Sequence, residues 1–329
     1  MDRRAFIAGL AGGLLAEPLA AKAQQAGKVY RLGVVWAISE PATAPYRAEL
    51  ESGLRELGWV AGQNIVFEHR FPENPDEFPK LAASVLAARV DAIAAMTNAV
   101  VAAVANATTE KPIVGVYMSD PISAGFAVSL PRPGKNVTGM TLDASPGVYA
   151  KQLELLKQLV PNARRVQILR NPDFYRTFNQ QVYSTTVETA AQSLRVEIYF
   201  SDVRSVDEIE NALRPSGQKR SAVYAMLDLL TFVHGPLIAK LAAKRRLPAI
   251  FGFREAVEAG ALASYGPDLV RMPRYAARFI DRLFRGARPS DLPIEQPTKF
   301  ELVINLKTAK ALGLTVPQSL LIRADEVIQ

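Results

Sequence analysis

Several strand-like apolar runs of this chain end in residues that could hold a ligand. In the first half these positions are Trp36, Ala37, Ser39, Thr97, Asn98, Ser119 and Asp120. In the second half they are Asn171, Asp228 and Tyr265. In open α/β sheets, ligands bind beyond the carboxyl ends of the strands. The sequence therefore predicts a binding cleft to which both halves contribute.

The residue types at these positions suit a small carboxylate-bearing molecule. Several of them precede expected helices, whose free backbone N–H groups and positive dipole ends attract an anion. Asp120 or Asp228 could hold a ligand ammonium group through a charge-assisted hydrogen bond. Trp36 and Tyr265 offer flat surfaces to an apolar part. We expect a ligand with a carboxylate and an apolar or aromatic part, such as an amino acid.

Structural roles compete with ligand binding at the same positions. Asn98 could simply cap a helix, and Asp120 before Pro121 is a good N-cap with proline at the first helical position. Asn171 belongs to an Asn-Pro turn pair. Trp36 could be a core or hinge residue, and Tyr265 could pack in a hinge. The sequence leaves these alternatives open.

Signals of catalysis and metal binding are missing from the sequence. There is no G-x-S-x-G elbow, Walker A loop or H-E-x-x-H motif, and no G-x-G-x-x-G follows a strand. The chain has no cysteine and only two histidines, His69 and His234. Structural disulfides, thiolate chemistry and a His-rich metal site are thereby excluded. We expect no enzyme, no cofactor and no metal.

Length and composition indicate a globular protein of two domains. The chain has 329 residues, of which 49% are hydrophobic and 22% charged. The net charge is +7, but the basic residues are scattered in short clusters, which is typical of a solvated surface. We therefore expect no nucleic-acid partner.

The first 23 residues have the layout of an export signal. Arg3 and Arg4 precede an apolar run, and an Ala-Lys-Ala site ends at Ala23. The paired arginines also resemble a twin-arginine signal. The competing interpretation is an amphipathic helix of the fold itself. With no cysteine to carry a lipid, the sequence predicts a soluble periplasmic protein without a lipid anchor.

Strands and helices alternate along the chain in two series. The expected strands of the first series are Val29–Val35, Asn64–Glu68, Asp91–Met96 and Ile113–Tyr117, followed by a short helix over Pro121–Leu130. The series restarts after Ser145, with expected strands at Arg165–Leu169, Val196–Phe200, Ala222–Met226 and Pro248–Phe251. This alternation predicts an α/β fold of two doubly wound parallel-sheet lobes.

Three segments are expected to cross between the lobes, namely Asn136–Leu142, Leu262–Gly266 and Gln296–Phe300. They divide the chain into an N-terminal lobe of residues 28–138 and 267–296 and a C-terminal lobe of residues 143–262 and 300–329. Lobes joined in this way form a hinged clamshell.

Runs over nearly the whole mature chain resemble the substrate-binding proteins of ABC transporters, in the tryptophan/tyrosine-type group. They are Gly53–Trp59, Gly62–Ile65, Asp120-Pro121, Arg132–Gly139, Leu153–Pro161, Ser264–Asp268 and the long C-terminal run Glu295–Ile328. Thr138, in the fourth run, joins the predicted ligand-binding positions. Lys135 and Ala261 depart from the pattern, because this family usually has glycine at both positions.

The resemblance implies a type I periplasmic-binding-protein fold that captures its ligand by closing two lobes. It also implies a permease and an ATPase subunit as partners, on separate chains, and we expect a monomer. The first βα loop, Trp36–Pro41, varies most among such proteins, so the ligand's identity does not carry over.

Other functions fit the same sequence. A periplasmic sensor that reports ligand occupancy to a membrane receptor would share the fold and the export signal. An enzyme on the same scaffold would turn its ligand over. A cytosolic regulator would need a DNA-binding motif before Val29, where the export signal lies.

Overall fold

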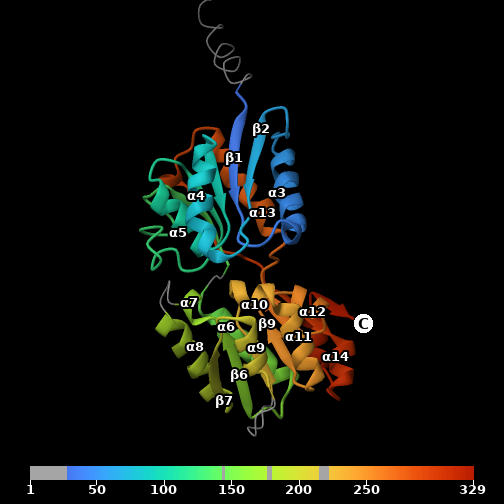
Figure 1. Ribbon diagram of the computed structural model, residues 1–329. Helices are drawn as coiled ribbons and strands as arrows, with labels where there is room; N and C mark the ends of the chain where they lie inside the picture. Colours follow the sequence, from blue (N-terminus) through green and yellow to red (C-terminus); the bar gives the residue numbers. More distant parts are fainter. Residues whose placement is uncertain (1–27, 143–144, 176–179, 215–221) are drawn as a thin grey trace, which may run out of the picture.

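The computed structural model describes residues 28–142, 145–175, 180–214 and 222–329. The export signal expected over residues 1–23 lies outside the described residues. Two α/β lobes lie one above the other in Figure 1. The upper lobe is built mainly from the first part of the chain and the lower lobe from the later part, so the two predicted series form separate bodies.

The described part of the first lobe holds a sheet of five parallel strands in the order β2-β1-β3-β4-β5. The strands are β1 (Tyr30–Val35), β2 (Ile65–Arg70), β3 (Ala92–Ala95), β4 (Ile113–Met118) and β5 (Val137–Thr141). The helices between them are α3 (Ala44–Glu56), α4 (Phe78–Ala87) and α5 (Asn98–Ala107), with 3-10 turns η1 (Pro41–Thr43) and η2 (Pro75–Glu77). The central strands are buried apolar runs, as expected of a parallel sheet covered on both faces.

The second lobe has, among the described residues, a seven-stranded sheet in the order β12-β11-β10-β9-β8-β6-β7. Its strands are β6 (Arg165–Arg170), β7 (Glu197–Asp202), β8 (Ala222–Ala225), β9 (Ala249–Phe251), β10 (Ala263–Gly266), β11 (Glu301–Asn305) and β12 (Glu326–Ile328). Only the β10–β11 pair is antiparallel in this described sheet.

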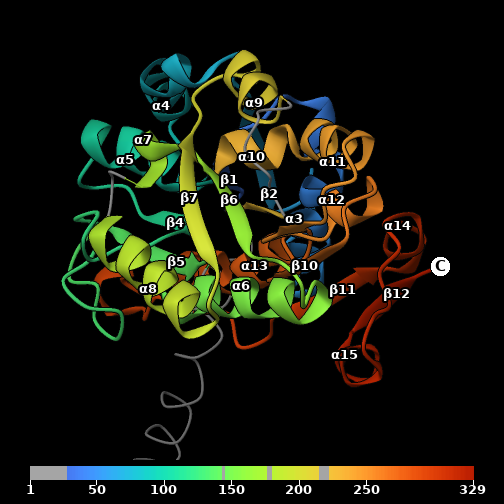
Figure 2. The same ribbon diagram turned by 90° about the horizontal axis from the view of Figure 1, so that it is seen from below.

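Helices cover both faces of the second sheet, and they lie close around it in Figure 2. They are α6 (Gly147–Leu159), α7 (Pro172–Tyr175), α8 (Gln180–Ser193), α9 (Val206–Ala212), α10 (Leu229–Val233), α11 (Gly235–Lys244), α12 (Glu255–Glu258), α14 (Leu306–Ala311) and α15 (Gln318–Arg323). Together with the first sheet, this confirms the predicted fold class.

The first expected crossing, Asn136–Leu142, is wrong in detail because most of it is strand β5. Val137–Thr141 pairs with β4 inside the first sheet, past residue 138 where we ended the N-terminal lobe. Gly139 makes this pairing possible: its φ is 127°, and a Cβ there would lie 2.0 Å from the Gly115 carbonyl oxygen. The chain leaves the first sheet only after β5.

The second link begins later than expected, and the third agrees with the expected segment. Leu262–Gly266 is largely strand β10, so the second link follows Gly266. The third link, Gln296–Phe300, joins Glu295, which bridges to Met140 of the first sheet, to β11 of the second. Between the last two links, helix α13 (Met272–Phe284) and the 3-10 turn η3 (Pro289–Asp291) return to the first lobe.

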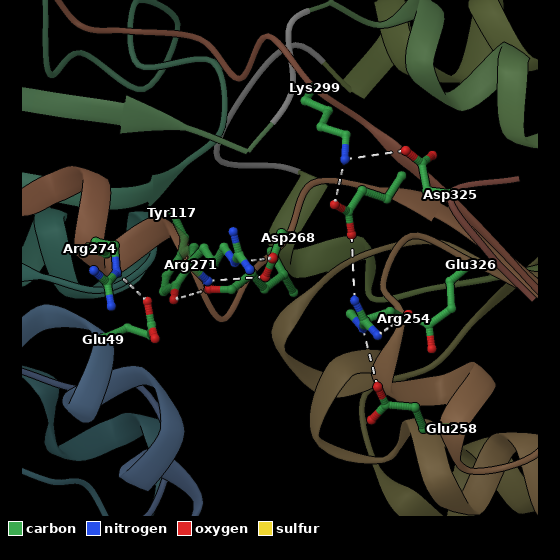
Figure 3. Close-up of polar contacts among 12 residues, drawn as sticks. Glu49, Tyr117, Arg254, Glu258, Asp268, Arg271, Arg274, Lys299, Asp325 and Glu326 are labelled. Atoms are coloured by element: carbon green, nitrogen blue, oxygen red, sulfur yellow. Dashed lines mark hydrogen bonds and ion pairs between the residues drawn. The ribbon is translucent and has the colours of Figure 1, made fainter. Parts of the chain in front are cut away.

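Helix α13 packs closely on α3. A Cβ on Gly53 would lie 2.7 Å from the Arg274 carbonyl oxygen, so glycine is needed at this contact. Arg274 Nε pairs with Glu49 at 2.7 Å, as Figure 3 shows, and Trp59 Nε1 donates to Asp281 at 2.9 Å. These contacts anchor the returning segment to the first lobe.

One further expectation differs from the structure. The helix expected over Pro121–Leu130 is a series of turns, and Gly125, with a φ of 77°, ends the helical conformation there. The C-terminal segment after α14 forms α15 and the edge strand β12. In the described part of the chain, no helix combines the length and apolar character needed to cross a bilayer.

Candidate functional site

A pocket that is partly open to solvent lies between the two lobes; we call it the interlobe pocket. The first lobe and the links contribute Trp36, Ala37, Ile38, Tyr46, Met96, Thr97, Tyr117, Leu142 and Leu269. The second lobe contributes Phe174, Leu227, Asp228, Leu229 and Phe232. Four predicted ligand-binding residues therefore meet in one place, namely Trp36, Ala37, Thr97 and Asp228.

Aromatic side chains from both lobes line the interlobe pocket, and we call them the aromatic wall. Trp36 follows β1 and is only 2% exposed, so it has the core position that the sequence left open as one alternative. Its indole Nε1 donates to His69 Nδ1 at 3.2 Å, and its ring stacks on Phe71 at 6.5 Å and 9°. The wall at this point is therefore a fixed apolar surface.

Tyr46 joins the two lobes across the pocket. Its hydroxyl donates to Glu255 Oε1 at 3.3 Å, and its ring lies edge-on to Phe232 at 6.3 Å. Burial and the neighbouring carboxylate of Glu255 raise the pKa of the Tyr46 hydroxyl well above its ordinary range, so it remains a donor. Tyr117 instead donates to the Leu269 carbonyl at 2.8 Å, shown in Figure 3.

Asp228 is a buried carboxylate without a cationic partner among the described residues. It caps α10, where Oδ1 accepts from Thr231 N–H at 2.8 Å, and Oδ2 accepts from Asn171 N–H at 2.8 Å. Burial raises its pKa to about 6 although these hydrogen bonds act in the opposite direction. Leu230 N–H also bonds to this carboxylate. Three backbone N–H groups therefore satisfy much of its acceptor capacity, and what these neutral donors do not supply is a positive charge.

Thr97 stands where α5 begins and has an unusual backbone. Its φ is 77°, a left-handed conformation that is costly for a β-branched residue. Its Oγ1 is buried and has no hydrogen-bond partner in the structure. The first turn of α5 leaves backbone N–H groups free beside it. Hydroxyl and helix end together present donors to an anion.

Asn98 and Ser119 hold each other in place outside the interlobe pocket. Asn98 Nδ2 donates to the Ser119 carbonyl at 2.7 Å, and its Oδ1 accepts from Ser119 N–H at 2.9 Å. The buried amide thus ties the end of β4 to the start of α5. Ser39 is exposed on the loop after Trp36 and does not line the pocket.

Asp120 lies at a second hollow, which we call the side hollow. The hollow is lined by Asp120, Pro121, Ile122, Leu130, Thr141, Ser145, Pro146, Val182, Tyr183 and Gln296. The φ of Asp120 is 40°, and its Oδ1 accepts from Ser123 N–H at 3.1 Å. It therefore stabilises a turn, not the helix N-terminus that we expected.

The remaining predicted residues have structural contacts. Asn171 Oδ1 accepts from Asp173 N–H at 3.0 Å at the start of α7. Thr138 is buried and donates to the Leu292 carbonyl at 2.9 Å. The Tyr265 ring stacks on Phe300 at 5.7 Å, and its carbonyl accepts from Gln152 at 2.6 Å. Ligand contact by these residues remains an untested prediction.

Sequence reasoning missed most of the aromatic wall. Tyr117 is the last residue but one of β4, and Phe174 follows the Asn-Pro turn by two positions. The rule that ligands bind beyond the carboxyl ends of strands, which we call the strand-end rule, would have selected both residues if apolar side chains had been considered there. Tyr46 and Phe232 lie inside helices α3 and α10, where sequence offers no such signal.

Charged residues elsewhere form ion pairs that are separate from the pocket. Lys299, in the third link, pairs with Glu301 at 3.0 Å and Asp325 at 3.2 Å, and Arg254 pairs with Glu258 at 3.2 Å (Figure 3). No group of three or more acidic or histidine side chains that could hold a metal occurs in the described ranges.

Comparison with known proteins adds to this geometry. The family described as ABC transporter substrate binding protein matches residues 31–328. A tyrosine-binding protein of Clostridioides difficile (strain R20291) is 25% identical over 290 residues, which are 87% of this chain and 82% of that protein.

Two solved structures share the fold over 92% of this chain and 100% of their own. The ABC domain from Streptococcus pneumonia in complex with L-Trp has a TM-score of 0.83 and 25% identity. The ligand-free, open structure of a substrate binding protein with adhesive properties from Clostridium difficile has a TM-score of 0.68 and 24% identity.

Substrate-binding proteins of ABC transporters are extracytoplasmic, are not enzymes, and work with other transporter components on small-molecule ligands. The fold found here is that of the type I periplasmic binding proteins. With a match that spans residues 31–328, this chain belongs to the ABC transporter substrate-binding protein family.

Proposed function

We propose that this protein is the solute receptor of an ABC importer and captures an aromatic amino acid between its lobes. The observation that carries the proposal is Asp228, a buried carboxylate for which the described part of the chain provides no cationic partner, in a pocket lined by aromatic rings from both lobes. A buried charge without a counter-ion is costly, and a ligand ammonium group would compensate it. The relatives that bind tyrosine and L-Trp support the same ligand class.

The other two parts of such a ligand have matching groups in the pocket. The carboxylate fits the N-terminus of α5, where the Thr97 hydroxyl lacks a partner. The aromatic ring fits between the rings of Trp36, Tyr46 and Phe232. Among the described residues that line the pocket there is no lysine or arginine, which suits a zwitterion with no net charge better than an anion.

Closure of the lobes would complete the site. The hydrogen bond from Tyr46 to Glu255 and the Tyr46–Phe232 contact both join the lobes. The TM-score is higher against the L-Trp complex, at 0.83, than against the ligand-free open structure, at 0.68. Both observations support an arrangement near the closed, ligand-holding state. We further propose that the three links are the boundaries between the lobes that move on closure.

The finer details of location and partners rest on the sequence. We propose export to the periplasm through the signal at residues 1–23, without a lipid anchor, and delivery to a membrane permease driven by an ATPase subunit. We further propose that the protein acts as a monomer and does not transform its ligand.

Calorimetry on the purified mature protein tests the ligand class. We expect L-tryptophan, L-tyrosine or L-phenylalanine to bind, and a ligand at 100 times its dissociation constant to add about 2.7 kcal/mol of stability. Tryptamine, which lacks the carboxylate, should bind much more weakly than L-tryptophan. Indole-3-propionate, which lacks the ammonium group, should also bind much more weakly. Binding of a sugar or a polyamine, with none of any aromatic amino acid, would overturn the proposal.

A further inference from the structure

The indole N–H of Trp36 points away from the ligand space. It donates to His69 Nδ1 at 3.2 Å, on strand β2, while the ring itself lines the interlobe pocket. Val34 is the register partner of His69, so the two strands bring Trp36, at the end of β1, beside the imidazole. The one polar atom of the Trp36 side chain is thereby bonded inside the protein and does not face the pocket.

A column of rings supports the imidazole from both sides. Phe67, His69 and Phe71 are alternate residues that share one face of the chain along β2 and just beyond it. The His69 ring stacks on Phe67 at 5.6 Å and 1°, and on Phe71 at 5.9 Å and 24°. Phe71 in turn stacks on Trp36. The position of the imidazole is thus fixed before any ligand enters.

The hydrogen bond requires a neutral imidazole. Nδ1 must keep its lone pair to accept, so the ring proton sits on Nε2, which lies 3.9 Å from Glu51 Oε1. Burial lowers the pKa of His69 to about 4, and Arg47 and Arg70 act in the same direction. Glu40 and Glu68 act against it but do not reverse the shift.

We propose that His69 is a positioning residue for the ligand wall: it fixes the orientation of the Trp36 indole and withdraws its N–H from the pocket. The inference rests on the proposed function, because it concerns the same site. With the donor occupied, the wall offers an apolar surface, which favours an aromatic ring over a hydroxyl-rich solute. Without an acceptor at position 69, a buried N–H would be left unpaired, and the indole would reorient.

Two substitutions separate the acceptor from the ring. His69→Phe keeps a ring between Phe67 and Phe71 but removes the acceptor. His69→Asn removes the ring but can place its amide oxygen near the Nδ1 position. The chain has two tryptophans, so a Trp59→Phe background leaves Trp36 as the only indole reporter.

Fluorescence of the ligand-free protein and calorimetry with L-tyrosine give the readouts. In the His69→Phe variant we expect altered Trp36 emission and about tenfold weaker binding of L-tyrosine, because the indole N–H loses its partner. In His69→Asn we expect emission and affinity close to the parent. Of the three proteins, only the parent should show an emission change on acidification, with a midpoint near pH 4, because only the parent has His69. Far-ultraviolet circular dichroism checks that the fold persists at this pH.

Parent-like emission and affinity in His69→Phe would overturn the inference and leave the proposed function standing. If neither L-tyrosine nor another aromatic amino acid binds the parent, the proposed function fails, yet the emission of the ligand-free variants still decides whether His69 positions Trp36. Emission altered equally in both variants would also count against the inference, since only ring packing would then matter.

Discussion

The interlobe pocket and the side hollow each draw residues from both lobes, and each holds one aspartate. Their surroundings differ. Asp228 is 2% exposed among aromatic rings, whereas Asp120 is half-buried in a turn beside Ser145, Gln296 and exposed Ile122. A charge excluded from water interacts more strongly with a ligand than one at a surface. Burial therefore favours the interlobe pocket over the side hollow as the proposed binding site.

The largest effect is expected from removing the aromatic wall. Trp36→Ala should lower the free energy of unfolding by about 3–5 kcal/mol, the range for deleting a buried aromatic side chain, and should weaken ligand binding as well. Ile122→Ala, in the side hollow, should change stability by no more than about 0.5 kcal/mol and leave binding unchanged. Chemical denaturation and calorimetry measure both variants. Equal effects of the two substitutions would contradict the comparison.

The two aspartates provide the next test. Asp228→Asn should weaken binding of an aromatic amino acid by about 1.5–3 kcal/mol, the range for hydrogen bonds to charged groups. Asparagine is also a good N-cap, so α10 should persist and the protein should fold. Asp120→Asn is the matched control and should bind like the parent. If calorimetry shows the reverse order, the ligand occupies the side hollow.

The lobes and the strand ends were predictable from the sequence because local patterns determine them. Continuous apolar runs such as Ile113–Tyr117 predict buried parallel strands, and the strand-end rule found Trp36, Thr97 and Asp228. The same rule also selected Asn98 and Tyr265, which have structural partners outside the pocket. What separates the two groups is the surface that each side chain faces, which depends on packing between distant segments.

The aromatic wall was unpredictable for a related reason. Tyr46 reaches the pocket from α3 and contacts Glu255, a residue 209 positions later in the chain. Such a contact exists only once the lobes are placed against each other. Likewise, the partnership of His69 with Trp36 follows from the pairing of β1 with β2, not from any motif around either residue.

The pH dependence of binding should report the charge of Asp228. Its folded pKa of about 6 lies above the ordinary 3.8, so its contribution to the stability of the empty protein is full below pH 3.8 and is lost as pH rises through about 6. A ligand ammonium group requires the ionised form, so affinity should change in the opposite direction.

Below pH 6, affinity for the amino acid should fall by up to about tenfold for each pH unit, since one proton must leave Asp228 on binding. Calorimetry at pH 7.5 and pH 5 measures the difference, and Asp228→Asn should abolish it. Asp120→Asn should retain it. Affinity that is constant between these pH values in the parent would mean that Asp228 does not pair with the ligand cation.

The smallest effect is expected at the contact that joins the lobes. Tyr46→Phe keeps the ring against Phe232 but removes the hydroxyl that donates to Glu255. A hydrogen bond to a charged group contributes about 1.5–3 kcal/mol. This one joins the lobes but is long, at 3.3 Å, so its loss should weaken closure and lower affinity by no more than about 1.5 kcal/mol. Burial raises the pKa of Glu255, and without the tyrosine donor its carboxylate would be still less well solvated in the closed state.

Tyr117→Phe is the matched control for this contact, because Tyr117 also lines the pocket but donates to the Leu269 carbonyl, not to the opposite lobe. It should lower stability slightly and leave closure intact. Small-angle scattering with and without saturating ligand separates the two variants, since a weakened closed state leaves a larger fraction of open molecules at subsaturating ligand. If Tyr46→Phe closes and binds as the parent does while Tyr117→Phe does not, the Tyr46–Glu255 contact has no part in holding the lobes together, and closure depends on the aromatic packing alone.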